Sequence, residues 1–356
     1  MPNSMIHPLK PACVTSRQSF LLVALHTIAV ACACCSATTL GDEPATKTPR
    51  FILEWGQHGS ENGEFNFPIG IAINRADEVF VTDFYNARVQ KFSAEGKFLA
   101  AFPVSPFPGG IALDRDGNLF IAHFGIPPSR YEQERKRDKI AVHSDTGKLL
   151  REWGKFGTGD GEFDLPGGIA ISRDGRVYVA DECNRRVQVF DMQGKFLTKW
   201  GQRGFKPGEF GGNPHAKAFF AGPTFLALDP QGNVFTTEAP LCRVQKFTPA
   251  GEPLLAWGDT EVGPGKFGGF FTAFGQGNMR GPMGICFDTQ GRLWTNSMSG
   301  RIQQFTEIGE YLQGFGEEGT KPGQFYAPHG LALDSQGHLF VVDAFNHRIQ
   351  KFDVGG

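Results

Sequence analysis

Cysteine is scarce in most of this 356-residue chain, and its scarcity excludes a fold that depends on a dense set of disulfides. Four of the seven cysteines lie within the first 35 residues, which leaves Cys183, Cys242 and Cys286 for the rest. Small secreted domains that depend on disulfides carry a denser, even-numbered set. Cys286 stands in a column otherwise filled by alanine and should pack inside a strand. For the other two, a Cys183–Cys242 disulfide and two unpaired thiols are both open.

Catalytic and metal-binding motifs are equally scarce. The sequence has no Gly-x-Ser-x-Gly elbow, glycine-rich phosphate loop or Cys/His metal spacing. Positive charge is not in excess either: losing Lys10 and Arg17 with an N-terminal leader leaves 33 basic residues against 37 acidic ones, a formal charge of about −4. Nucleic-acid affinity comes largely from clustered Lys and Arg that neutralise phosphates, so this balance argues against a nucleic-acid partner.

An apolar stretch stands near the N-terminus, at Ser19–Ala31. It is short for a membrane span and small residues follow it, which is the order of a secretory signal peptide. We expect residues 1–37 to be that signal, cleaved after Ala33 or Ala37, and residues 38–50 to be a polar tether. A membrane anchor is the alternative, and Ala29–Cys32 is a weak match to a lipoprotein box. The mature chain should be exported (periplasmic, cell-surface or secreted) and have no membrane span.

What the sequence does contain is a repeat of Gly-Ile-Ala-Ile/Leu-(Asp)-x-x-Gly-x-Val/Leu-Phe/Tyr-Val-x-Asp. Its anchors stand at Gly70, Gly110, Gly168, Phe225, Gly284 and Gly330. Thirteen residues after each anchor comes a second column: Asp83, His123, Asp181, Glu238, Ser297 and Asp343. Five units continue with Arg and a Val/Ile-Gln-x-Phe run, at 88–92, 186–190, 243–247, 301–305 and 348–352. Such periodicity indicates an array of similar supersecondary modules.

Each unit is expected to contain four antiparallel strands, which in the first unit are 70–74, 79–82, 89–92 and 98–102. Alternation of apolar and polar residues in the third strand predicts that it is half-buried. The last unit ends without a fourth strand, whereas residues 51–55 resemble the fourth strands of other units. The sequence therefore predicts an all-β, six-bladed β-propeller over residues 51–356, in which the N-terminal strand completes the last blade.

Two of the units resemble the NHL repeat, through Asp181-x-x-Asn184-x-Arg186-Val-Gln-Val-Phe190 and Asp343-x-x-Asn346-His347-Arg348-Ile-Gln-Lys-Phe352. The linkers that begin at Gly59, Gly157 and Gly319 are also typical of that family. The resemblance covers residues 51–356 and implies a propeller. It specifies function less well, because propellers host binding modules and several enzyme chemistries. Some animal members bind RNA, but we find no basic stripe that repeats from blade to blade.

The recurring polar columns are expected to be structural rather than catalytic. A catalytic group is needed once, whereas the Asp and Arg of the repeat return with the fold. We expect each Asp to cap the turn between the second and third strands and to pair with the Arg. Tryptophans at the ends of fourth strands and phenylalanines in the linkers should pack between blades: Trp55, Trp153, Trp200, Trp257, Phe65, Phe163, Phe210, Phe267 and Phe325.

Three insertions distinguish individual units. The linkers 200–223 and 257–282 are longer than their equivalents, and the second unit has an extra stretch at 124–138. Because strands alternate in direction, all three should emerge on one face of the ring, where binding groups concentrate. We expect this face to bind a protein, peptide or glycan, unless its phenylalanines fold back over their own loops. The candidate binding residues are His215, Phe219, Phe220, Phe270, Phe271, Phe274, Arg280 and His329.

An enzyme is the competing hypothesis. Pro328-His329-Gly330 resembles a segment of peptidyl-α-hydroxyglycine α-amidating lyases, six-bladed propellers in which histidines at the tops of inner strands bind zinc. That resemblance implies three converging imidazoles, but His329 is the one histidine in its column, so His123 and His215 would have to complete the set. A lactonase-like site would need calcium, for which the inner strands offer few ligands. No cofactor is expected, and zinc or calcium belongs to the enzyme alternative.

Overall fold

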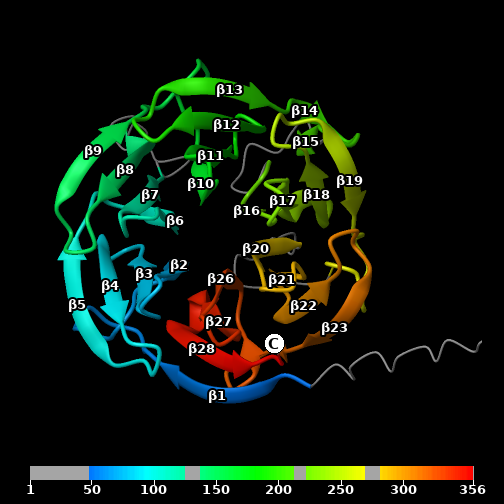
Figure 1. Ribbon diagram of the computed structural model, residues 1–356. Coiled ribbons are helices and arrows are strands. Elements are labelled where there is room, and N and C mark those ends of the chain that lie inside the picture. The colour runs from blue at the N-terminus through cyan, green and yellow to red at the C-terminus, as the bar shows by residue number, and fades with distance from the viewer. Residues whose placement is uncertain (1–47, 125–136, 212–221, 269–280, 356) are drawn as a thin grey trace, which may run out of the picture. The chain divides into compact units, whose positions relative to one another are not determined.

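The computed structural model describes residues 48–124, 137–211, 222–268 and 281–355, which form six four-stranded antiparallel blades around a central axis (Figure 1). The predicted all-β, six-bladed propeller is thus confirmed. The expected signal, residues 1–37, lies outside the described residues.

The first three blades each contain four consecutive strands. Blade 1 consists of β2 (Pro68–Ile73), β3 (Val79–Asp83), β4 (Arg88–Phe92) and β5 (Phe98–Pro103). Blade 2 consists of β6 (Pro108–Leu113), β7 (Leu119–His123), β8 (Lys139–His143) and β9 (Leu149–Trp153). Blade 3 consists of β10 (Pro166–Ile171), β11 (Arg176–Asp181), β12 (Arg186–Asp191) and β13 (Phe196–Trp200).

The other three blades follow the same order. They consist of β16 (Leu226–Leu228), β17 (Val234–Glu238), β18 (Arg243–Phe247) and β19 (Pro253–Trp257); β20 (Pro282–Phe287), β21 (Leu293–Ser297), β22 (Arg301–Phe305) and β23 (Tyr311–Phe315); and β26 (Pro328–Leu333), β27 (His338–Asp343), β28 (Arg348–Asp353) and β1 (Arg50–Trp55). Strand β1 pairs antiparallel with β28, so the two ends of the described chain share the sixth blade. No helix in the described segments is long and apolar enough to cross a membrane.

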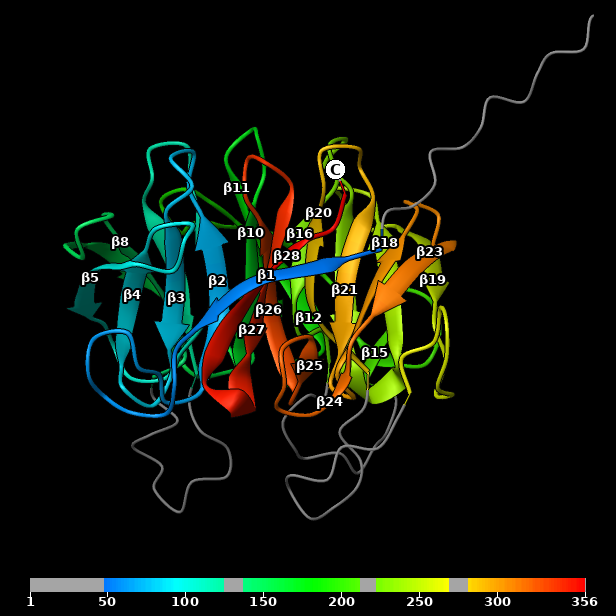
Figure 2. The same cartoon turned by 90° about the horizontal axis from the view of Figure 1, so that it is seen from below.

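Short elements lie in the linkers and turns. Parallel two-residue pairs occur between β14 (Arg203–Gly204) and β15 (Phe210–Gly211), and between β24 (Glu317–Glu318) and β25 (Gln324–Phe325). Two 3-10 turns, η2 (Ala239–Leu241) and η3 (Ala344–Asn346), connect second to third strands. In Figure 2, the labelled linker strands β15, β24 and β25 lie toward one face of the ring, opposite the hairpins between first and second strands.

The anchor glycines allow the inner strands to approach one another around the central axis. A Cβ atom on Gly70 would lie 2.4 Å from the carbonyl oxygen of Gly109, and one on Gly284 would lie 2.0 Å from that of His329. Both distances are far below van der Waals contact, so a side chain would push neighbouring blades apart. In the fourth unit Phe225 replaces the glycine, and β16 is correspondingly short, beginning only at Leu226.

Aromatic rings pack from blade to blade, as the recurring tryptophans predicted. The ring of Trp55 in blade 6 lies 5.6 Å from Phe92 in blade 1 and 6.1 Å from Phe340 in its own blade. Trp153 is placed in the same way, 5.8 Å from Phe190 of the following blade. The linker phenylalanines are completely buried beside these rings: Phe65, Phe163, Phe210, Phe267 and Phe325. The ring is therefore held by apolar seams between adjacent blades.

Buried glutamines attach the linkers to the third strands. In blade 1, Gln90 Oε1 accepts a hydrogen bond of 2.9 Å from the backbone N–H of Gly63, and its Nε2 donates to the carbonyl oxygen of Glu64. The same paired contacts are made by Gln188, Gln245, Gln303 and Gln350. All five side chains are fully buried, so the prediction of half-buried third strands is wrong at these positions.

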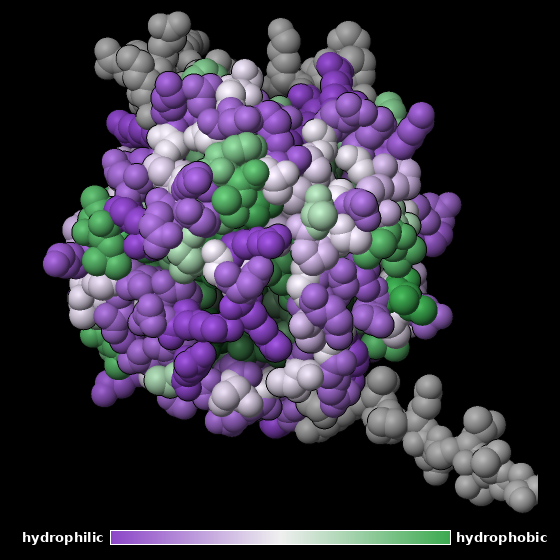
Figure 3. Space-filling view, turned by 45° about the horizontal axis from the view of Figure 1, so that its top comes forward, coloured by the Kyte–Doolittle hydropathy of each residue, from purple (hydrophilic) through white to green (hydrophobic). Residues whose placement is uncertain are grey.

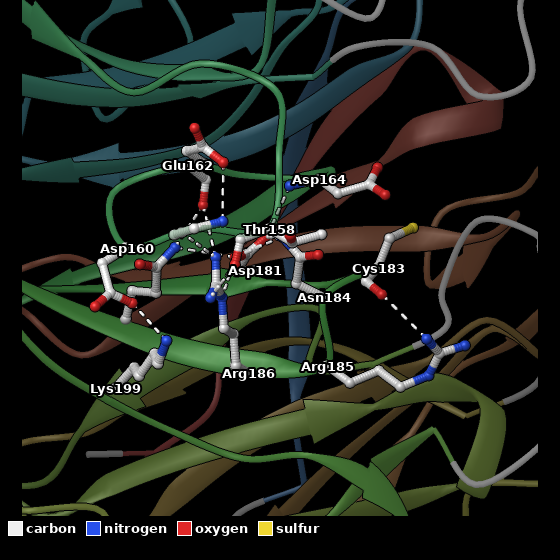
Figure 4. Close-up of polar contacts among 12 residues, drawn as sticks. Thr158, Asp160, Glu162, Asp164, Asp181, Cys183, Asn184, Arg185, Arg186 and Lys199 are labelled. Carbon is white, nitrogen blue, oxygen red and sulfur yellow. Dashed lines mark hydrogen bonds and ion pairs between the residues drawn. The ribbon is translucent and has the colours of Figure 1, made fainter.

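An acid–arginine pair strengthens this attachment, as Figure 4 shows for blade 3. Arg186 Nε donates to Asp181 Oδ2 at 2.7 Å, while its terminal nitrogens donate to the linker carbonyls of Thr158, Gly159 and Glu162. Asp181 Oδ1 accepts from the backbone N–H of Asp164 in the same linker. The predicted pairing is confirmed, but the amide that each Asp holds is 17 residues upstream, not in the turn between second and third strands.

None of the three cysteines of the propeller forms a disulfide within the described residues, so Cys183 and Cys242 are not joined. Cys242 is buried and Cys286 packs at the edge of the cluster around Trp294. Burial raises the pKa of the Cys286 thiol, which keeps it protonated at neutral pH. The expectation that Cys286 is a strand-packing residue is confirmed, and these thiols have no assigned role beyond packing.

The buried pair makes a prediction for stability. Replacing Arg186 with Met should lower the free energy of unfolding by about 3–5 kcal/mol, because it leaves a charged Asp181 buried without its partner. The matched control is Arg176→Met: the side chains of Arg176 and Asp174 are 47% and 61% exposed, and such surface pairs contribute about 0–1 kcal/mol. Urea denaturation monitored by tryptophan fluorescence measures both. Equal losses in the two variants would contradict the structural role of Arg186.

Candidate functional site

The described flanks of the three insertions lie on one face of the ring, which we call the insert-bearing face. It is the face at which second strands end and third strands begin. The flanks of the insertions contact these strand ends: Phe124 directly follows β7, the Gly211 N–H donates to Glu238, and Ser299 Oγ donates to the Gly268 carbonyl at 3.3 Å. The predicted grouping of the insertions on one side is consistent with these positions.

Most of the sequence-predicted binding residues fall within the insertions themselves. His215, Phe219, Phe220, Phe270, Phe271, Phe274 and Arg280 lie outside the described residues. Their predicted exposure and their contribution to binding therefore remain predictions. His329, at the start of β26, is the one candidate binding residue that the structure describes.

His329 is a buried residue of the inner strand. Its Nδ1 lies 2.8 Å from the carbonyl oxygen of Ala327, which places the ring proton on Nδ1. The imidazole packs against the ring of Phe67 at 5.4 Å. Burial lowers the pKa of His329 to about 4, so the ring is neutral at neutral pH. His329 is thus a buried, hydrogen-bonded residue of an inner strand.

His123 occupies the position that is Asp in three other blades. Its Nδ1 lies 3.3 Å from the carbonyl oxygen of Pro106, and its Nε2 is buried without a hydrogen-bond partner among the described residues. Burial lowers the pKa of His123 to about 3, and the positive charge of Lys139 acts in the same direction. The linker before blade 2 is short. The imidazole of His123 therefore contacts the carbonyl of Pro106, whereas Asp83 in blade 1 accepts a hydrogen bond from the backbone N–H of Asn66 in its linker.

A zinc or calcium site does not fit the described residues. Neutral imidazoles such as His123 and His329 can ligate metals, but no three His, Cys, Asp or Glu side chains of the described chain come close enough together to hold one. The acids at the ends of inner strands are occupied by their own turns. Asp114 Oδ1, for example, accepts the backbone N–H groups of Asp116 and Asn118.

A cluster of aromatic side chains on the insert-bearing face was not predicted. Phe84 lies 5.2 Å from Phe107 and 5.6 Å from Phe124, and Tyr85 packs against Phe67 at 5.9 Å. Phe345 of blade 6 extends the cluster, 4.9 Å from Phe67. The side chain of Tyr85 is 57% exposed, so the cluster reaches the surface over blades 1, 2 and 6. We call these residues the aromatic cluster: Phe67, Phe84, Tyr85, Phe107, Phe124 and Phe345.

Two members of the aromatic cluster have an unusual backbone. Phe67 and Phe107 directly precede the prolines that begin β2 and β6, and their φ angles are +63° and +58°. This left-handed region costs a side-chain-bearing residue about 1–2 kcal/mol. It is a feature of the repeat, because Leu165, Gly281 and Ala327 also have positive φ at the equivalent position of blades 3, 5 and 6. The Phe67 amide donates to His347 Nδ1 at 3.1 Å, and its carbonyl accepts from Phe84. Neighbouring blades thus hold Phe67 in this conformation.

A signal for the aromatic cluster was present in the repeat. The position before the first-strand proline reads Phe67, Phe107, Leu165, Gly222, Gly281 and Ala327, and the position after the acidic column reads Phe84, Phe124, Glu182, Ala239, Met298 and Ala344. Both columns are aromatic in blades 1 and 2 alone. Comparing these loop columns between units would have identified the cluster.

Comparison with known proteins assigns the repeat. The NHL repeat profile matches residues 65–92, 163–190 and 325–352. These are blades 1, 3 and 6, the blades in which an Asn also joins the attachment: Asn86, Asn184 and Asn346 each donate to the acid of their column and to a linker glycine carbonyl. The profile therefore matches the blades in which the acid, the Asn and the Arg of the repeat all bond to the preceding linker.

Curated relatives match this chain over part of their length. The B-box type zinc finger protein ncl-1 of Caenorhabditis elegans is 28% identical over 265 residues, which cover 74% of this chain and 25% of the relative. Peptidyl-glycine alpha-amidating monooxygenase of Mus musculus is 35% identical over 143 residues, covering 38% and 14%. The chain thus spans a quarter or less of these proteins.

Solved structures share the fold. A structural-genomics protein of unknown function from Bacteroides thetaiotaomicron superimposes with a TM-score of 0.63 at 16% identity, over 86% of this chain and 76% of that one. Virginiamycin B lyase from Staphylococcus aureus gives 0.52 at 15% identity, over 85% and 99%. Identities this low establish architecture alone. From the profile matches and the six blades together, the chain is an NHL-repeat β-propeller.

Proposed function

We propose that this protein is an exported binding scaffold that holds a protein, peptide or glycan on its insert-bearing face. NHL-repeat propellers mediate protein interactions. The observation that carries the proposal is the aromatic cluster, whose rings contact one another across blades 1, 2 and 6. The insertions with Phe219, Phe220, Phe270, Phe271 and Phe274 would extend the same surface.

The chemistry of the aromatic cluster suits such a ligand. Tyrosine and phenylalanine rings offer large apolar faces at a low cost in conformational entropy, and exposed Tyr is enriched at binding hot spots. Tyr85 adds a hydroxyl that can exchange hydrogen bonds with a peptide backbone or a sugar.

Replacing Tyr85 with Ser tests the binding face. Peptides selected from a random phage library, and sugars selected on a glycan array, would be titrated against the full chain by calorimetry. We expect Tyr85→Ser to weaken the selected ligands by about tenfold or more, as for a central aromatic contact. The control is Leu254→Ser, because Leu254 is 53% exposed on the outer strand β19. Undiminished binding to Tyr85→Ser, or no ligand from either library, would contradict the proposal.

Export is tested at the N-terminus of the mature protein. Expressed with residues 1–37 in place, the chain should leave the cytoplasm and lose this leader, because Ser19–Ala31 has the order of a signal peptide. Mass spectrometry of the purified protein should then find Cys34 or Thr38 as the first residue. A lipid-modified Cys32 would identify a surface lipoprotein, which is also exported. Full-length protein retained in the cytoplasm would contradict export.

A further inference from the structure

The opposite face of the ring contains a hollow that the proposed function does not use. This face, which we call the hairpin face, carries the turns between first and second strands. A hollow of about 770 Å³ lies there over blades 1 to 3, a size typical of small-molecule sites. Figure 3 views this face and shows strongly hydrophilic side chains around a central hollow with hydrophobic atoms at its floor.

The lining of the hollow repeats from blade to blade. Its apolar part comes from the ends of the three inner strands, at Ile73, Leu113 and Ile171. Two residues further along each chain segment stands an arginine: Arg75, Arg115 and Arg173. Blades 4 to 6 have Pro230, Thr289 and Ser335 at this position.

These arginines differ from the arginines of the third strands. Arg88, Arg186, Arg243 and Arg348 are committed to acids and linker carbonyls. By contrast, Arg75, Arg115 and Arg173 are exposed and form no ion pair or hydrogen bond within the described residues. Three guanidinium groups thus surround one hollow with all their donors available. Their planar N–H pairs match the geometry of carboxylate and phosphate oxygens.

The acids in the lining limit what the hollow can hold. Asp114 is engaged by its own turn, where Oδ2 accepts from Asn118 Nδ2 at 2.8 Å. Asp116 and Asp145 lie in turns at the edge of the same hollow and would repel an extended polyanion such as a nucleic acid. A compact ligand with one oxyanion group avoids that repulsion and can place its apolar part over Ile73, Leu113 and Ile171.

We propose that the hollow on the hairpin face binds a small organic anion, with a carboxylate or phosphate held by Arg75, Arg115 and Arg173 and an apolar body against the inner-strand ends. This site is separate from the insert-bearing face, since strand β3 runs between Arg75 and Tyr85. Binding at one face can therefore be lost without loss at the other.

Calorimetry of the full chain with simple probes tests this site. Hexanoate and hexyl phosphate represent the two oxyanions, hexanol removes the charge, and inorganic phosphate removes the apolar body. We expect one or both organic anions to bind with a dissociation constant below about 1 mM, and hexanol and inorganic phosphate to bind at least about tenfold more weakly. Whichever organic anion binds more tightly identifies the oxyanion.

Arg115→Gln is the informative variant, because Arg115 lies on the middle of the three blades. It should weaken binding of the organic anion by about tenfold through loss of charge-assisted hydrogen bonds, while Arg203→Gln, an exposed linker arginine elsewhere, and Tyr85→Ser should leave it unchanged. All these side chains are exposed, so the fold should persist in every variant. Equal binding by wild type and Arg115→Gln, or no anion binding at about 10 mM, would overturn the proposal.

Discussion

Buried hydrogen bonds from glutamine side chains to linker backbone are the interaction on which the rest of this propeller depends. Each linker must cross the ring between one blade and the next, and its amide and carbonyl groups are then removed from water. A buried backbone group without a partner costs more free energy than the bond itself contributes. Gln90 and its four equivalents remove that cost by offering a donor and an acceptor from the third strand. The apolar seams can therefore close over the linkers.

This arrangement separates the structural residues from those available for function. Where the full set of acid, asparagine, arginine and glutamine is present, in blades 1, 3 and 6, polar side chains are used up in holding the ring. The groups that remain available lie at loop positions on the two faces. One face presents aromatic rings beside the insertions, and the other presents arginines around a hollow. Because these two chemistries lie on opposite faces of the ring, the two sites that we propose are separate in space.

Much of the fold could be predicted from the sequence, because the repeat fixes strand order and each glycine anchor is required by close contact between inner strands. The position of Trp55 between blades followed from the same repeat. The burial of the glutamines could not be predicted, since alternation within a strand does not reveal that a linker covers its polar side. The aromatic cluster and Arg115 were missed because they lie in turns, where the signal is the difference between units at one repeat position and not the motif that the units share. The binding residues in the insertions remain predictions.

Hydrogen–deuterium exchange of a Gln90→Leu variant tests the central role of these attachments most directly. Loss of the acceptor should expose the Gly63 amide, and the linker should then loosen as a unit. The amides of Phe84 and Tyr85, which bond to the carbonyls of Phe67 and Asn66, should exchange about tenfold faster or more. Gly161 in blade 3, held by its own Gln188, should be unaffected. Faster exchange at Gly63 alone, with Phe84 and Tyr85 unchanged, would contradict the account.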